Sequence, residues 1–460
     1  MNQKRGQNPK RIPYGIANYE QIVYDNYFFV DKTEYIRTLE NYSSPVFLRP
    51  RRFGKTLLCS ILECYYDVKR KEKFATLFGH TAIGKNPTGE QNNYLVMRFN
   101  FSTVSVGENM PLLEKNFDFN INLVYQLFLT NYQEYFQKFT LETGPSSAQL
   151  QSILSFISEN NLPQLYLIID EYDNFSNQLV LAQDEGLYEE LTSKDSFFKT
   201  FFKVIKAGTE SGAIGRVFIT GVLPITIDDL TSGYNIAEIV TLKEPLHSML
   251  GFTQEELEIY LAEIYQSRRF NSANLSTVLS VLKNYYNGYR FLPNCESLYN
   301  STIINFFLKD FIESEGKIPR EFIDTNLRTD LNWIRRLTRY EADTKAMLDQ
   351  LMFNDRIRYD IAKLSSKFNA RQFFDAQYYP VSLFYLGMIS ITDDFAMVFP
   401  NQTMKEIFAD YYNEINKIVV TDSYIGAFEK FSKDRELSKL FSVYWNHDMG
   451  QISSQAADKV

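Results

Sequence analysis

The sequence is poor in cysteine and histidine, with three residues of each among 460. Three cysteines cannot build a disulfide framework, and their spacing matches no zinc-binding pattern. Three widely separated histidines argue against a histidine-based metal site. These scarce residues are Cys59, Cys64, Cys295, His80, His247 and His447. Cysteine usage of this kind is typical of a reducing compartment, so we expect a cytoplasmic protein.

Long hydrophobic runs and a positive net charge are also missing. The longest stretch without a charged residue, 376–392, contains Pro380 and is shorter than the roughly 20 apolar residues of a membrane span. The start, 1–11, is basic and polar without an apolar core, so we expect no secretory signal and no membrane partner. The formal charge of −8 provides no overall attraction to nucleic acid. A local basic face remains an open alternative.

The composition, 45% hydrophobic and 23% charged, is that of a folded protein with room for two or three domains. Short apolar runs with β-rich composition recur, and helix-length segments separate the first four of them. Alternation of this kind predicts an α/β fold in which helices cover both faces of a parallel sheet. The expected strands are Val46–Leu48, Tyr94–Phe101, Leu165–Ile169, Val217–Thr220 and Ile236–Leu242.

The strand signal fades after Leu242, where Thr253 and Glu256 form a capping box that predicts the start of a helix. Helical patterns follow, and then a helix, a two-stranded hairpin beginning near Tyr385, and a final helix. We therefore predict an α/β domain, a second, helical domain, a small winged-helix-like module and a helical or polar tail. Their expected boundaries are 1–245, 246–355, 356–420 and 421–460.

Residues 45–62 have the order of a phosphate-binding loop: an apolar strand, a cationic turn, Gly-Lys-Thr and an apolar-faced helix. A helix start offers unpaired N–H groups and a partial positive charge to an anion. Gly54 lets the backbone approach the phosphates, Lys55 reaches the terminal phosphates, and the Thr56 hydroxyl can hold Mg²⁺. Arg49 stands where the P-loop pattern has its first glycine. Because Gly-Lys-Thr also occurs by chance, this motif alone does not establish a nucleotide site.

A second motif places two carboxylates directly after an apolar strand. Residues 165–169 are apolar or aromatic, and Asp170 and Glu171 follow them. The carboxyl ends of parallel strands are where open α/β sheets bind ligands. In P-loop nucleotidases the first acid holds Mg²⁺ and a following group orients or deprotonates the attacking water. The two motifs together predict that Asp170 holds the metal with Thr56 and that Glu171 is the general base. A strand that simply ends in solvated acids is the alternative.

Several further polar residues have two interpretations each. Thr220 ends the strand 217–220 and is predicted to sense the γ-phosphate or position the water, unless it is only a strand exit. Arg216 and Arg290 are candidates for an arginine finger or ordinary surface arginines. Asp173 is expected to be structural. The residues predicted to contact the nucleotide are Arg49, Arg51, Arg52, Phe53, Gly54, Lys55, Thr56 and Leu57. The three arginines have two interpretations: they bind phosphate, or they pair with acidic side chains.

In this order the motifs resemble those of the prokaryotic AAA-ATPase-like proteins, whose phosphate loop reads R-P-R-R-F-G-K-[ST]. The loop Arg49–Thr56 matches this pattern, and the matches extend in order from Pro13 to Asn401. The other matching segments are Phe29–Thr33, Ile169–Asp173, Thr220–Val222, Ser232–Asn235, Gly251–Thr253 and Tyr286–Phe291.

The resemblance implies an AAA-like P-loop fold with a helical lid that binds ATP and hydrolyses it. The missing first glycine is a trait of that family, whereas Leu223 and Tyr285 depart from its pattern outside the site. Many relatives continue into a PD-(D/E)xK nuclease-like domain. The residues after Asn401 contain no strand, acid and E-x-K arrangement, so we expect no nuclease module here.

The leading hypothesis is an ATPase that uses Mg²⁺ and couples hydrolysis to a conformational change. The adenine is expected near the loop Tyr14–Ile16 and the segment Val30–Thr33. One alternative is a non-hydrolysing regulatory or interaction protein. Another is a DNA-associated ATPase of a defence or mobile-element system that acts through the module near 360–418. The sequence leaves self-association and the protein partner open.

Overall fold

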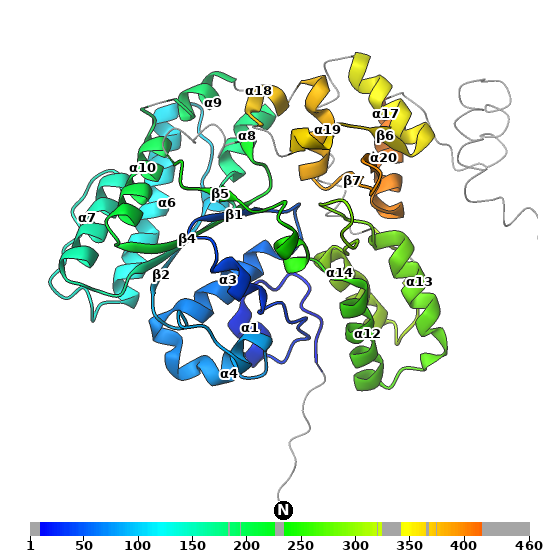
Figure 1. Cartoon of the computed structure of the whole chain (residues 1–460), viewed down its shortest axis with the longest axis horizontal. Coiled ribbons are helices and arrows are strands. Elements are labelled where there is room, and N and C mark those ends of the chain that lie inside the picture. The colour runs from blue at the N-terminus through cyan, green and yellow to red at the C-terminus, as the bar shows by residue number, and fades with distance from the viewer. Residues whose placement is uncertain are drawn as a thin grey trace, which may run out of the picture.

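The computed structural model describes residues 10–182, 185–193, 195–225, 234–319, 321–323, 342–364, 368–373 and 375–415. Its centre is a five-stranded sheet with the order β2-β3-β4-β1-β5, in which every pairing is parallel (Figure 1). These are the five strands that the apolar runs predict, although β5 is shorter than expected. Their bounds are β1 Pro45–Leu48, β2 Leu95–Asn100, β3 Leu165–Asp170, β4 Ile214–Gly221 and β5 Glu238–Ile239.

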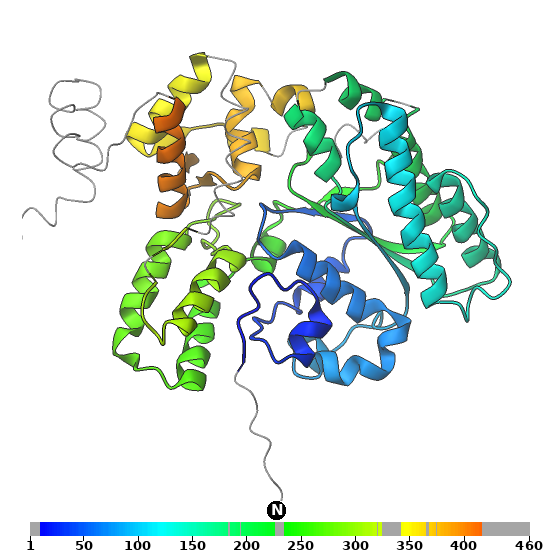
Figure 2. The same cartoon turned by 180° about the vertical axis from the view of Figure 1, so that it is seen from behind.

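Helices cover both faces of this sheet, as the alternation of elements predicts (Figures 1 and 2). Successive side chains of a strand point to opposite faces. On one face, Tyr166 of β3 stacks on Tyr66 of α3, with ring centroids 4.3 Å apart. On the other face, Phe99 of β2 contacts Tyr125 of α6 and Phe201 of α10. These helices are α3 Lys55–Tyr66, α6 Met110–Asn131 and α10 Phe197–Glu210.

Shorter helices complete the layers around the sheet. The predicted pair of helices between β2 and β3 is present as α6 and α7. The remaining helices before β5 are α1 Tyr19–Tyr24, α2 Tyr35–Leu39, α4 Phe74–Phe78, α5 Ala82–Lys85, α7 Ser146–Glu159, α8 Asn174–Ala182 and α9 Glu185–Leu191. Cys59 and Cys64 are buried in α3, which agrees with their expected packing on the helix after Lys55.

A region of helices follows the sheet and lies beside the N-terminal segment (Figures 1 and 2). The predicted capping box is formed: Thr253 and Glu256 exchange side-chain hydrogen bonds with each other's backbone N–H at the start of α12. The helices of this region are α12 Gln254–Arg268, α13 Leu275–Tyr286 and α14 Ser301–Glu313. Helix α17 Ala342–Asn354, which the predicted boundary 246–355 includes, packs instead against β6 Arg356–Arg358 and α20 Gln402–Ile415 (Figure 1). Residues 324–341 of the predicted lid domain lie outside the described residues.

The third region is a small antiparallel sheet with helices around it. The sequence predicts a two-stranded hairpin, but the sheet has the order β6-β8-β7, so β6 adds a strand that was missed. Tyr385 ends a helix instead of starting a strand, because Gly387 turns the chain at φ +77° before β7. The elements are β6 Arg356–Arg358, β7 Ser390–Ile391, β8 Ala396–Val398, α18 Ala370–Phe373, α19 Tyr379–Tyr385 and α20 Gln402–Ile415. The winged-helix assignment stays a prediction, and the tail 421–460 lies outside the described residues.

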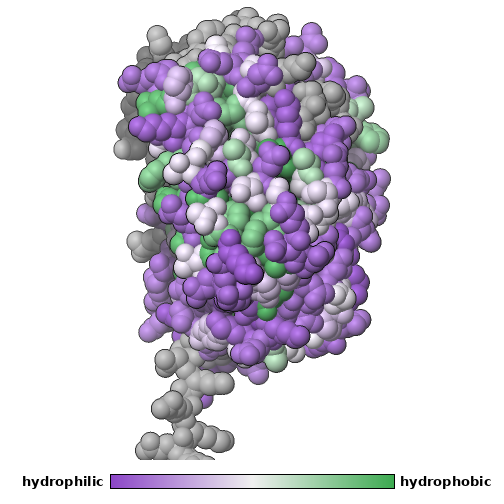
Figure 3. Space-filling model, turned by 90° about the vertical axis from the view of Figure 1, so that its left-hand side faces the viewer, coloured by the Kyte–Doolittle hydropathy of each residue, from purple (hydrophilic) through white to green (hydrophobic). Residues whose placement is uncertain are grey.

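The side of the molecule that carries α7 is mainly hydrophilic, with a group of apolar residues near its middle (Figure 3). Apolar side chains exposed singly are normal for folded proteins. Among the described ranges, no helix combines the length and the apolar character that crossing a membrane requires.

Candidate functional site

The strand register brings the ends of β1, β3 and β4 to one edge of the sheet. Leu48 pairs with Gly221, and Ile169 pairs with Ile219. Beyond the strands, the Arg49 N–H donates to the carbonyl of Gly221 over 3.3 Å. The loops after these three strands therefore lie side by side at the carboxyl edge, where parallel sheets bind ligands.

The loop 49–54 after β1 leads directly into α3, whose first residue is Lys55. Two of its residues adopt left-handed backbone conformations, Arg52 at φ +70° and Gly54 at φ +95°. A glycine adopts this conformation without strain, but an arginine does so at a cost of about 1–3 kcal/mol. The Lys55 ammonium is buried and donates to the carbonyls of Arg49 and Pro50 over 3.0 and 3.1 Å. The loop is thus a closed turn wrapped around the lysine side chain.

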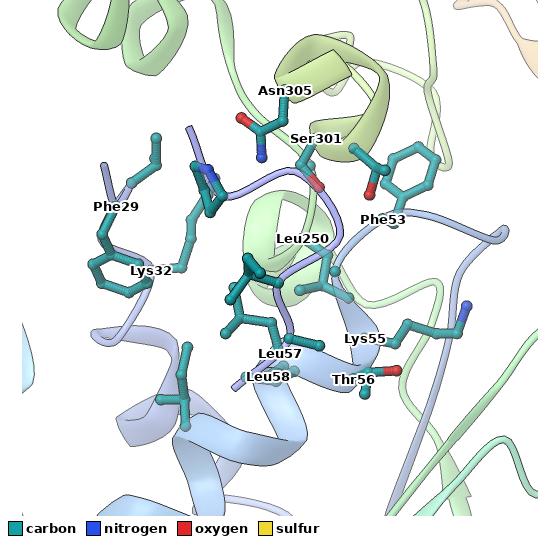
Figure 4. Close-up of a pocket in the computed structure, with 18 of the residues that line it drawn as sticks. Phe29, Lys32, Phe53, Lys55, Thr56, Leu57, Leu58, Leu250, Ser301 and Asn305 are labelled. Carbon is teal, nitrogen blue, oxygen red and sulfur yellow. The ribbon is translucent and has the colours of Figure 1, made fainter. Parts of the chain in front are cut away.

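A cavity of about 260 Å³ lies against this loop and the start of α3. Its wall includes residues 52–58, Glu171, residues 249–252, and Ser301, Thr302 and Asn305 of α14. The N-terminal segment closes another side with Pro13, Gly15, Ile16, Ala17, Phe28, Phe29, Val30, Lys32 and Thr33. In Figure 4, Lys55 and Thr56 lie at one end, Phe29 and Lys32 lie at the other, and Ser301 and Asn305 face the helix α3. The end at α3 therefore carries Lys55 and Arg52, while the end at the N-terminal segment combines apolar side chains with Lys32, whose ammonium pairs with Glu256 over 2.6 Å.

Asp170 lies at the end of β3 and is fully buried. Its Oδ2 accepts a hydrogen bond from Arg98 over 3.0 Å, and the same guanidinium donates to the carbonyl of Thr56 over 3.3 Å. Arg98 also lies 3.5 Å from Glu63 of α3. Arg98 therefore links the acid strand to the Gly-Lys-Thr helix, so the two predicted motifs lie next to each other.

Asp170 is not among the residues that line the cavity, but its carboxylate is a candidate for holding a metal ion. Its Oδ1 is buried and has no hydrogen-bond partner. A buried carboxylate oxygen without a partner is costly unless a ligand satisfies it. No group of three or more His, Cys, Asp or Glu side chains suited to a metal is found in the described part of the chain. This donor set fits Mg²⁺, which proteins commonly hold with one or two carboxylates while phosphates supply further oxygens.

Glu171 follows Asp170 in a left-handed conformation, at φ +52°. This is a second strained non-glycine residue on the wall of the same cavity, and strain of this kind concentrates at functional sites. Burial raises the pKa of the Glu171 carboxyl, while the nearby Lys55 ammonium opposes the shift and Asp173 adds to it. Glu171 is thus close enough to Lys55 for the ammonium to favour its ionised form.

The structure places Arg49 and Thr220 outside this cavity. The Arg49 guanidinium is buried between the rings of Phe47 and Phe291, at 4.3 and 4.0 Å from their centroids. It donates to backbone carbonyls that include those of Thr241 and His247, both over 3.0 Å, and burial lowers its pKa to about 9. The Thr220 hydroxyl donates to the carbonyl of Phe47 over 2.7 Å. Both side chains are engaged in joining elements of the fold, which a pattern read along the sequence does not reveal.

The other predicted residues divide between the site and the scaffold. Arg52 lines the cavity, and Arg51 is exposed beside it. Arg216 binds Glu90 and lies at the opposite end of β4, whereas Arg290 pairs with Asp393 over 2.5 Å. The structure therefore brings neither candidate arginine finger to the cavity within this chain.

Asp173 is structural, in agreement with its expected role. Its carboxylate is fully buried and accepts from the backbone N–H groups of Val222 and Leu223, the latter over 2.7 Å, and from the amide of Asn177. It thereby ties the end of β3 to the end of β4. An added Cβ at Gly221 would lie within 2.6 Å of the Tyr172 ring, so this crossing has room only for glycine.

Two parts of the site were not predicted from the sequence. Arg98 is the only charged residue in β2, and such a charge in a buried strand is a signal that a partner lies nearby. The wall supplied by α14 comes from a segment nearly 250 residues beyond the loop, as in the pair of Asn300 and Arg51, which are separated by 249 positions. No local sequence pattern predicts that contact.

Comparisons with protein families and with solved structures found matches. Residues 13–231 match the model of a family described as a predicted AAA-ATPase, AAA-ATPase-like. A solved Walker-type ATPase of Pyrococcus abyssi is similar over 88% of this chain and 99% of that chain, with 12% sequence identity and a TM-score of 0.44. A search of curated proteins found no match.

Proposed function

We propose that this chain binds Mg²⁺-ATP in the cavity and hydrolyses its γ-phosphate. One observation carries the proposal: Lys55 and Thr56 at the start of α3 and Glu171 after β3 line the same cavity. Arg98 joins the neighbouring Asp170 to the same helix start. The match of residues 13–231 to a predicted AAA-ATPase family supports the same conclusion.

The phosphates are proposed to bind at the N-terminus of α3, against the segment Arg52–Leu57. The first N–H groups of that helix have no helical partner, and its dipole favours an anion there. Gly54 keeps this surface free of a side chain and provides the left-handed turn. In the proposed complex, Lys55 exchanges its two carbonyl partners in the loop for the terminal phosphates. Arg49 is assigned to the scaffold, because its guanidinium is committed elsewhere.

The adenosine is proposed to occupy the opposite end of the cavity. Ile16 and Val30 provide apolar surface there and come from the two segments Tyr14–Ile16 and Val30–Thr33 in which the adenine is expected, and Phe29 adds to the same surface. Met249, Leu250 and Tyr260 of the helical region add to the same wall. Apolar surface with a few polar groups is the usual lining of a small-molecule site.

Asp170 and Thr56 are proposed to hold the Mg²⁺, with the free Oδ1 of Asp170 as the carboxylate ligand. When bound, the metal ion supplies positive charge that neutralises the charge developing on the β- and γ-phosphates. Glu171 is proposed to accept the proton of the attacking water. Burial raises its pKa toward the range in which a general base is most effective, while Lys55 favours its ionised form.

The helical region after β5 is proposed to respond to the nucleotide. Its helix α14 forms part of the cavity wall through Ser301, Thr302 and Asn305, so occupation of the cavity and the placement of this helix depend on each other. The boundaries 1–245, 246–355 and 356–420 remain our proposal for the units that move.

A matched set of variants tests hydrolysis and binding separately. Lys55→Ala should weaken Mg²⁺-ATP binding by about a hundredfold, since charge-assisted hydrogen bonds contribute roughly 1.5–3 kcal/mol each. Glu171→Gln should keep binding and reduce turnover by about 10²- to 10⁴-fold, the usual contribution of a general base. Lys115→Ala on the exposed side of α6 is the control and should change neither value. Calorimetry measures binding, and phosphate release measures turnover.

The outcome also separates the alternative functions. Retained turnover in Glu171→Gln would remove the base assignment. A wild-type protein that binds Mg²⁺-ATP but releases no phosphate would be the non-hydrolysing regulator. The DNA-associated alternative gains no support from the third region, where Arg356 and Lys405 pair with Asp394 and Asp355 at 2.6 and 2.9 Å.

A further inference from the structure

The start of α14 binds the phosphate loop and also forms part of the cavity wall through Ser301 and Thr302. The side-chain amide of Asn300 donates to the carbonyl of Arg51 over 3.2 Å. The backbone N–H of Thr302 donates to the carbonyl of Arg52 over 3.2 Å, and the Ser301 hydroxyl reaches the same oxygen at 3.4 Å. Two consecutive carbonyls of the loop therefore point toward α14.

The direction of these carbonyls decides where the loop's N–H groups point. In a trans peptide the C=O and N–H bonds lie on opposite sides of the chain, and no cis peptide bond occurs among the described residues. When the carbonyls of Arg51 and Arg52 face α14, the N–H groups of Arg52 and Phe53 point away from α14. The contact with α14 therefore fixes the peptide orientations of the loop, and an anion-binding loop depends on the direction of its N–H groups.

The same loop is packed from outside by neighbouring parts of the C-terminal regions. The ring of Phe53 meets those of Tyr289 and Phe291 edge-on, with centroids 5.1 and 5.6 Å apart. Pro50 lies so close to Gly387 that an added Cβ would come within 2.5 Å of the proline ring. The left-handed Arg52 thus sits in a loop that residues far along the chain surround.

The side-chain amide of Asn300 uses its oxygen and its nitrogen for two different contacts. Its Oδ1 accepts from the N–H groups of Thr302 and Ile303 and caps α14, while its Nδ2 donates to the loop. We propose that Asn300 is a positioning residue that fastens α14 to the phosphate loop and keeps the loop in its phosphate-binding conformation. This inference rests on the proposed nucleotide site and makes the shape of the loop depend on the position of the helical region.

The coupling runs in both directions. A displacement of α14 withdraws Asn300 and Thr302 from the loop, and the same displacement moves Asn305 in the cavity wall. Binding and the helix position are therefore linked by the same free energy in either direction. This contact is the physical connection between phosphate binding and the helical region.

The test is Asn300→Ser in the full chain. Serine caps a helix about as well as asparagine, but its shorter side chain cannot also reach the carbonyl of Arg51. Asn109→Ser is the matched control, because Asn109 caps α6 through its Oδ1 and lies outside the cavity wall. Three readouts are compared: affinity for Mg²⁺-ATP and inorganic tripolyphosphate, affinity for adenosine, and amide hydrogen exchange of residues 49–56.

In Asn300→Ser, the affinities for Mg²⁺-ATP and tripolyphosphate should fall roughly fivefold, the equivalent of one hydrogen bond. Adenosine affinity should stay unchanged, and exchange at residues 49–56 should accelerate. The control should match the wild type in every readout. A variant that only lost helix stability would not show reduced affinity for tripolyphosphate together with unchanged affinity for adenosine.

Unchanged tripolyphosphate affinity together with unchanged exchange in Asn300→Ser would overturn the inference. If the wild type bound neither ATP nor tripolyphosphate, the proposed function would fail, and exchange at residues 49–56 would still decide whether Asn300 holds the loop. Equal effects on adenosine and tripolyphosphate would also count against a role in positioning the phosphate loop.

Discussion

Arg98 is the cation that holds Asp170 in the absence of a metal ion, and its replacement by methionine provides a quantitative test of the site. Asp170 is fully buried, and Arg98 is 21% exposed. Without Arg98, both oxygens of the Asp170 carboxylate lack a partner, since Oδ1 already has none. Removing one partner of a buried ion pair costs about 3–5 kcal/mol. Because water reaches Arg98 in part, we expect Arg98→Met to lower the free energy of unfolding by about 3 kcal/mol.

The measurement is urea-induced unfolding at pH 7 without nucleotide, followed by circular dichroism. The double variant Arg98→Met/Asp170→Asn should be more stable than Arg98→Met, because no unpaired buried charge remains. Mg²⁺-ATP should stabilise Arg98→Met more than the wild type, because the metal ion returns a positive charge to Asp170. Arg216→Met, which breaks an ion pair at the other end of the sheet, is the control and should show no such excess.

A loss below 1 kcal/mol in Arg98→Met, or a double variant no more stable than Arg98→Met, would refute this reasoning. Either result would mean that Asp170 is not an isolated buried charge. The proposed metal site would then lose its strongest structural support.

Two further predictions concern the scaffold around the site. Gly221→Ala should destabilise the protein by about 1–3 kcal/mol through overpacking, since the new Cβ meets Tyr172 and the carboxylate of Asp173; a urea midpoint equal to that of the wild type would contradict it. Burial lowers the pKa of His247 to about 4 from its ordinary 6.5, and the Arg49 guanidinium adds to the shift. The stability that neutral His247 provides is complete above pH 6.5 and disappears as the pH falls toward 4, a loss of about 3 kcal/mol. His247→Asn should lack this part of the acid sensitivity in urea titrations at pH 7 and pH 4.5, and an unaltered pH dependence in the variant would exclude His247 as its source.

Much of the α/β architecture follows from local patterns. The five parallel strands were predictable because buried strands are apolar runs, and β3 is apolar from Leu165 to Ile169. The capping box at Thr253 was predictable because it depends on two residues three positions apart. The small sheet was predicted less well. A three-residue strand with alternating burial, such as Arg356–Arg358, carries too little pattern to be recognised.

The site shows the same division. Gly54, Lys55, Thr56 and Glu171 were assigned from motif order, and the structure gathers them around one cavity. The roles proposed for them await the experiments above. Arg49 illustrates the opposite case, since an arginine beside a phosphate loop has the same appearance in a sequence whether it faces the ligand or is buried under aromatic rings.

By itself, the sequence determined the alternation of strands and helices as far as β5 and the place of the loop 49–54 between β1 and α3, because these depend on hydrophobic period and on neighbouring residues. Only the tertiary structure decided that Arg98 joins Asp170 to α3 and that Asn300 binds the loop at Arg51. Those contacts join residues 72 and 249 positions apart. Side-chain partners at such separations are set by how the layers pack, and no local property of the chain encodes them.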